Sequence, residues 1–233
     1  KGKRSPYFED ERRIRMAEAF LQARREPWLL LIHLVDTHCC SEDREEPIRL
    51  PDRNVGRLVR FLRDTGQLER TAILVYSDHT PRWGTLGRIP MILVVPGEAG
   101  GESVATNVQL ADVAPTILEL SGIARPEWMS GHSLLRVGDV SRTRPIFSLV
   151  ELGTNGLVGP EMKVVEDATA PLYGAASAAA IVCEEWVKLT FAANEFDRGV
   201  IAGHTAPCGG ASRQEGLTLI LEDHLRANEY PVP

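Results

Sequence analysis

Apolar positions near the start of the chain recur every three or four residues, which predicts an amphipathic helix over residues 7–25. The positions concerned are Ile14, Ala17, Phe20 and Leu21. Residues 28–35 then form a nearly unbroken apolar run. Such a run is typical of a strand that is buried on both faces of an α/β sheet. We therefore expect a buried strand here, with His33 as a hydrogen-bonded core residue.

A second helical pattern begins at Asp52, which can cap a helix, and stops at Gly66. Its apolar positions face inward, whereas the arginines between residues 57 and 63 are most simply a solvated face. Two apolar runs, residues 71–77 and 91–95, predict strands, and residues 110–122 predict a third helix.

The last third of the chain has a different pattern. Residues 151–180 show little periodicity, residues 180–191 predict a strand that residues 200–205 could pair with, and residues 216–228 predict a final helix. The order of elements favours an α/β layered sheet flanked by helices over residues 1–147. A small α+β subdomain is expected over residues 148–233.

Composition narrows the class of protein. The 233 residues are 43% hydrophobic and 25% charged, as in ordinary globular proteins, which argues against disorder and coiled coils. No apolar run approaches the roughly 20 residues that span a bilayer, and no apolar run follows the basic start as in a signal peptide. The net charge of −6 makes nucleic-acid binding a poor hypothesis.

Four cysteines leave the compartment open. Cys39 and Cys40 are adjacent, whereas Cys183 and Cys208 are far enough apart to close a disulfide loop. Two reduced, buried thiols are the equal alternative. No Cys-x-x-Cys spacing indicates a structural zinc site.

Two acidic–histidine pairs follow predicted strands: Asp36-Thr37-His38 and Asp78-His79. Ligands of open α/β sheets bind beyond the carboxyl ends of the strands. A carboxylate and an imidazole there suit a divalent cation, or one ligand beside a proton-transfer group. The alternative for each pair is a turn or helix cap.

A series of motifs resembles the sulfatases and their relatives in the alkaline phosphatase superfamily. The run from Leu68 to His79 is similar to the family's segment that leads into a metal-binding Ser-Asp-His. Residues 88–97 resemble its next strand, residues 110–123 its D-x-x-P-T helix, and residues 27–38 its strand ending in Asp-Pro-His. The motifs occur in the family's order across residues 7–147.

The resemblance implies hydrolysis or transfer of sulfate or phosphate esters, with a formylglycine, Ser or Thr nucleophile and one or two metal ions. Asp78 and His79 match the metal ligands, for calcium or for manganese or zinc. His38 matches a residue that binds the transferred oxyanion or protonates the leaving group. The candidate substrate contacts are Asp36, Arg82, Arg88 and, from the tail, His204.

The family's nucleophile motif, Cys/Ser-x-Pro-x-Arg, does not occur in this sequence. The chain therefore resembles the C-terminal half of such an enzyme, and the missing N-terminal half is its expected partner. A site with only part of the ligand set should hold a cation weakly. Relatives are frequently secreted, periplasmic or membrane-anchored, and we expect the same here.

Two hypotheses from different classes follow. The first is a hydrolase-type domain whose N-terminal half has been removed by truncation or processing, so that this chain alone is inactive and regains activity when that half is supplied. The second is a non-catalytic binding or assembly module. Within the superfamily, a phosphodiesterase or phosphoethanolamine transferase is a further alternative, because the sequence does not separate sulfate from phosphate.

Overall fold

The structure is a computed structural model, and it describes residues 10–24, 26–35, 46–79, 86–98, 100–151, 175–201, 208, 212–230 and 232. The chain divides into two compact units, residues 1–74 with 94–99 and residues 75–93 with 100–233. Within the described ranges, the helices are all too short or too polar to cross a membrane.

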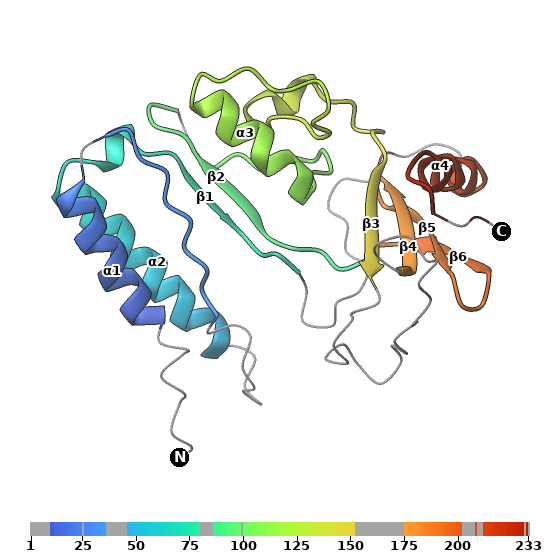
Figure 1. Cartoon of the computed structure of the whole chain (residues 1–233), viewed down its shortest axis with the longest axis horizontal. Coiled ribbons are helices and arrows are strands. Elements are labelled where there is room, and N and C mark those ends of the chain that lie inside the picture. Colours follow the sequence, from blue (N-terminus) through green and yellow to red (C-terminus); the bar gives the residue numbers. More distant parts are fainter. Residues whose placement is uncertain are drawn as a thin grey trace, which may run out of the picture. The chain divides into compact units, whose positions relative to one another are not determined.

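Two helices form the main part of the first unit. They are α1 (Asp10–Ala23) and α2 (Glu46–Asp64), and the 3-10 turn η3 (Leu68–Arg70) follows. Both helices were predicted, although α2 begins before the expected start at Asp52. They lie side by side (Figure 1), and the guanidinium of Arg57 joins them by donating to Glu18 at 2.8 and 2.7 Å.

Residues 28–35 correct one prediction. The segment is extended, but it is not part of a strand, and exposure alternates along it. Leu29 and Leu31 are 71% and 78% exposed, and His33 is exposed on the same side. The prediction of two-sided burial and of a core His33 is therefore wrong. Within the part of the chain that the structure describes, no strand pairs with residues 28–35.

The two predicted strands that follow are confirmed. β1 (Ile73–Tyr76) and β2 (Met91–Val94) pair as a two-stranded sheet. The predicted third helix is η4 (Leu110–Asp112) continued by α3 (Val113–Leu120), and η5 (Leu134–Asp139) comes next.

A four-stranded antiparallel sheet ends the second unit. Its order is β3 (Ile146–Glu151), β4 (Ala175–Val182), β5 (Glu185–Thr190) and β6 (Glu195–Val200), and α4 (Gln214–Ala227) follows. The single strand predicted over residues 180–191 is wrong, because the chain turns at Cys183, whose φ is +54°. The boundary predicted at residue 147 falls inside β3 and stays a prediction.

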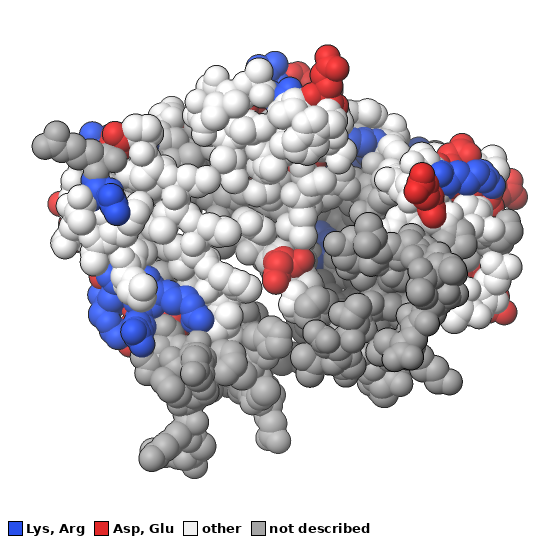
Figure 2. Space-filling model, in the orientation of Figure 1, with Lys and Arg blue, Asp and Glu red and all other residues white. Residues whose placement is uncertain are grey.

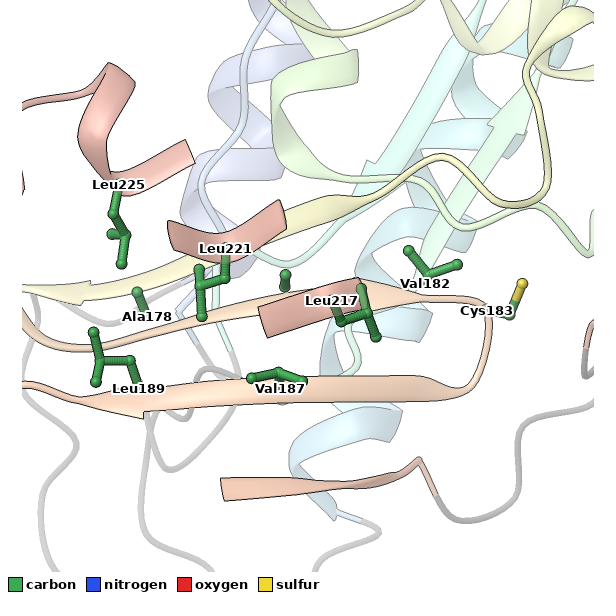
Figure 3. Close-up of a cluster of buried hydrophobic side chains, with 9 residues drawn as sticks. Ala178, Val182, Cys183, Val187, Leu189, Leu217, Leu221 and Leu225 are labelled. Atoms are coloured by element: carbon green, nitrogen blue, oxygen red, sulfur yellow. The ribbon is translucent and has the colours of Figure 1, made fainter. Parts of the chain in front are cut away.

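Leucines one turn apart on α4 pack onto this sheet (Figure 3). Leu217, Leu221 and Leu225 are buried against alternate residues of β4 and β5. β4 contributes small alanines at this face, which lets the helix approach the sheet closely. Burial of each leucine stabilises the unit by about 1.5–3 kcal/mol.

Candidate active site

A tight turn at the end of β1 carries the predicted pair Asp78 and His79. The Ser77 hydroxyl donates to the carbonyl oxygen of His79 at 2.7 Å, and Asp78 Oδ1 accepts the backbone N–H of His79 at 3.0 Å. These local bonds fix the conformation of the three residues directly after the strand. The turn is therefore held by its own side chains and backbone.

The turn leaves its carboxylate open to solvent. The Asp78 side chain is 61% exposed, the His79 side chain is 22% exposed, and His79 Nε2 lies 3.8 Å from Asp78 Oδ2. Cation–ligand distances of about 2.0–2.6 Å let two donors at this separation reach one ion. A hard carboxylate oxygen beside an imidazole nitrogen thus fits a divalent cation.

A buried carboxylate in the first unit fixes the backbone of the residue that precedes Asp36. Both oxygens of Asp10 accept the backbone N–H of Val35, at 3.0 and 2.8 Å. Asp10 is 1% exposed, and Arg13 Nη1 donates to it at 2.6 Å. The first turn of α1 therefore fixes the end of the extended segment. Spacing along the sequence gave no sign of this contact.

The remaining predicted site residues divide into two groups. Arg88 is described and is exposed, three residues before β2. His38, Asp36, Arg82 and His204 lie outside the described residues.

The second unit holds a disulfide between Cys183 and Cys208, with 5.8 Å between their Cα atoms. Glu184 adds to this link, because its Oε2 accepts the backbone N–H of Cys208 at 2.9 Å. The two sulfurs and the Glu184 carboxylate lie within 4.8 Å of one another. Thiolate and carboxylate are donor types that also suit a metal ion. In the disulfide form the sulfurs are bonded to each other, so this group acts as a covalent link.

A buried ion pair joins three segments of the second unit. The Asp112 carboxylate accepts two bonds from Arg144, at 3.0 and 2.6 Å, and also the backbone N–H groups of Gln109 and His132. Arg144 Nη1 also lies 2.8 Å from His132 Nδ1. The sequence predicts only a helix over residues 110–122, which contains Asp112. Nothing in the spacing linked Asp112 or His132 to Arg144.

A small cavity of about 120 Å³ opens between the four-stranded sheet and α4. The imidazole of His224 lines it and stacks on Phe147, with ring centroids 3.7 Å apart and an interplanar angle of 4°. Burial lowers the pKa of His224, because the charged imidazolium loses solvation there. This histidine therefore packs within the second unit.

Comparison with known sequences identifies relatives of this chain. The profile of the family described as Sulfatase matches residues 2–123, just over half of the chain. Arylsulfatase K of Danio rerio is 32% identical over 96 residues. That match covers 36% of this chain and 18% of the relative, so the chain spans only a small part of the relative's length.

Solved structures resemble the chain in fold. One, solved with its substrate D-glucosamine-2-N,6-O-disulfate, has a TM-score of 0.55 and 19% identity, and the match covers 80% of this chain and 40% of that one. The phosphonate monoester hydrolase of Silicibacter pomeroyi has a TM-score of 0.51 and 22% identity, with 76% and 38% covered. These similarities show the alkaline-phosphatase-like fold.

Proposed function

This chain belongs to the sulfatase family, and from that premise we propose that the complete protein is a metal-dependent hydrolase of sulfate esters. The observation that carries the proposal is the turn after β1, which presents an exposed Asp78 carboxylate 3.8 Å from the Nε2 atom of His79. Such an arrangement suits a cation that contacts a substrate oxyanion.

Asp78 and His79 would hold the divalent cation, calcium or else manganese or zinc. When bound, the cation would neutralise charge on the ester group and polarise its oxygens. Asp78 would contribute one negative charge to the site, and His79 a neutral nitrogen. With only these two ligands from the described residues, affinity for the cation would be weak.

Other residues of the chain would act on the substrate. His38 would hold an oxygen of the sulfate group or donate a proton to the leaving oxygen. The proposed substrate contacts are Asp36, Arg82, Arg88 and His204. An arginine suits this role because its planar guanidinium matches an oxyanion.

The nucleophile and the other metal ligands would come from the part of the domain that precedes these motifs. That N-terminal half is the partner we propose, and the sequence printed here holds no Cys/Ser-x-Pro-x-Arg motif. The exposed side chains of Leu29 and Leu31 are consistent with a surface that this part of the domain covers. On its own the chain would not turn over substrate.

Two alternatives have specific support. Phosphate or phosphonate esters are the alternative substrates, because one structural neighbour is a phosphonate monoester hydrolase. A non-catalytic binding or assembly module would also use the exposed apolar side of residues 28–35.

The disulfide between Cys183 and Cys208 supports an oxidising compartment, that is, a secreted, periplasmic or membrane-anchored protein.

The test uses the complete protein with 4-nitrophenyl sulfate, 4-nitrophenyl phosphate and a phosphonate monoester. Asp78→Ala and His79→Ala should each lower kcat/KM at least about 100-fold, because each removes a metal ligand. Asp64→Ala, at the exposed end of α2, is the control and should retain activity. Calcium or manganese titrated by calorimetry should bind more weakly to both site variants. Unchanged turnover in Asp78→Ala would refute its assigned role.

A further inference from the structure

One face of α2 carries a stripe of arginines, which we call the arginine stripe: Arg49, Arg53, Arg57, Arg60 and Arg63. With about 100° between successive helix residues, Arg49, Arg53 and Arg60 fall within an arc of about 40°. Arg57 and Arg63 flank them on either side. Three acidic residues of α2, Glu46, Asp52 and Asp64, oppose these five charges, and Arg57 also pairs with Glu11 and Glu18 of α1 at 3.7 and 2.7 Å.

The stripe lies on the outer side of the helix. Arg49, Arg53, Arg60 and Arg63 are exposed, whereas Leu62, on roughly the opposite side of α2, is 2% exposed. In Figure 2, Lys and Arg side chains gather over the part of the molecule that Figure 1 labels α1 and α2. The chain as a whole has a net charge of −6, so this positive surface is a local feature.

One contact fixes part of the stripe. Arg57 is held to α1 by the two hydrogen bonds to Glu18, and these hydrogen bonds to the carboxylate raise the pKa of its guanidinium. The guanidinium of Arg60 lies against the helix surface beside Gly56, where a Cβ atom would stand at an ordinary van der Waals distance of 3.5 Å from Arg60 Nη1.

We propose that the arginine stripe binds a sulfated polysaccharide and thereby holds a polymeric substrate on the enzyme. The stripe is linear, at about 1.5 Å rise per residue it extends for roughly 21 Å, and all of its cations are guanidinium groups. Guanidinium groups bind oxyanions through paired hydrogen bonds. A linear polymer with repeated sulfate groups is complementary to this surface in both charge and shape. The choice of polymer rests on the proposed sulfatase function.

The test compares two variants of the complete protein that lose the same charge. Arg49→Gln/Arg53→Gln/Arg60→Gln alters the stripe, and Arg136→Gln/Arg198→Gln/Arg226→Gln alters exposed arginines of the second unit. Heparin is the probe, titrated at several salt concentrations, and circular dichroism checks that both variants fold. The stripe variant should lose about tenfold or more in affinity, with a salt slope smaller by about three. The control should bind like wild type.

Several outcomes would overturn the proposal. The first is that the wild-type protein does not bind heparin at about 0.15 M salt. The second is that both variants lose the same affinity for heparin. The third is that the wild type binds unsulfated hyaluronan as tightly as heparin. Stronger binding to vesicles of anionic phospholipid, or to DNA, would assign the stripe to another partner. Heparin binding is also measured in Asp78→Ala. If that variant binds normally while the wild type shows no turnover on any ester, the proposed function fails and the stripe proposal stands.

Discussion

The carboxylate of Asp10 accepts the backbone N–H of Val35 with both of its oxygens, at 3.0 and 2.8 Å. Val35 directly precedes Asp36, the first residue of the predicted Asp-Thr-His motif. The contact joins the first turn of α1 to a segment 25 residues away. A buried charge that is hydrogen-bonded in this way restricts the position of the backbone. The start of α1 therefore fixes the backbone of the first unit as far as Val35.

Asp10→Asn should destabilise the protein by about 1–3 kcal/mol, because it replaces a charge-assisted bond and turns an amide N–H toward other donors. Since the backbone before His38 loses its anchor, kcat in the complete protein should fall as well. Urea unfolding and 4-nitrophenyl sulfate turnover measure the two effects. Glu11→Gln is the control, because its side chain is 66% exposed and its loss should cost no more than about 1 kcal/mol. Equal stability of the two variants would contradict the role of Asp10.

The buried pair of Asp112 and Arg144 predicts a large effect on stability. The two side chains are 1% and 12% exposed, so removing one leaves the other charge buried without its partner. Arg144→Met should therefore cost about 3–5 kcal/mol in urea unfolding. Breaking the more exposed Arg136–Glu119 pair by Arg136→Gln is the comparison, and should cost at most about 1 kcal/mol. A loss of similar size in both variants would show that burial of the first pair does not matter.

The lowered pKa of His224 predicts how stability depends on pH. The folded protein takes up this proton at lower pH than the unfolded chain, in which the pKa is near 6.5. Between the two pKa values the unfolded state binds more protons, so stability is full above pH 6.5 and falls as the pH drops toward the folded pKa. The stability of the His224→Leu variant should fall less over this pH range. Urea unfolding midpoints measured at several pH values would show this. Parallel curves for the two proteins would contradict the assignment.

The disulfide should stabilise the second unit. Cys183 and Cys208 are 25 residues apart, and closing such a loop lowers the entropy of the unfolded state, which raises its free energy by about 3.5 kcal/mol in the chain-entropy treatment. Cys183→Ser/Cys208→Ser should lose stability by up to this amount under oxidising conditions. Under reducing conditions the wild type and the variant should unfold at nearly the same urea concentration. Mass spectrometry without reduction checks the bond itself, and free thiols at both positions would remove this prediction.

Local patterns predicted much of the fold, and long-range contacts explain what they missed. α1, α2 and the strand before Ser77 follow from apolar periodicity, and so the Asp78-His79 turn was correctly placed at a strand end. β4 was missed because its run of alanines carries no alternation of apolar and polar residues. The hairpin after it was missed because Cys183, and not a glycine, adopts the positive φ. Likewise the bonds of Asp10 and Asp112 join distant segments, which spacing along the sequence does not encode.

Gly131 should tolerate no side chain. Its φ is +88°, and a Cβ atom there would overlap with the carbonyl oxygen of Ala111, next to the buried Asp112. Gly131→Ala would therefore add backbone strain to a steric clash, and should cost more than about 2 kcal/mol in urea unfolding. Gly138→Ala is the matched control, because Gly138 has no positive φ and a Cβ atom there meets nothing within 4 Å. If Gly131→Ala proved as stable as the control, the close approach of these two segments would be wrong, and with it the position of the His132 backbone against Asp112.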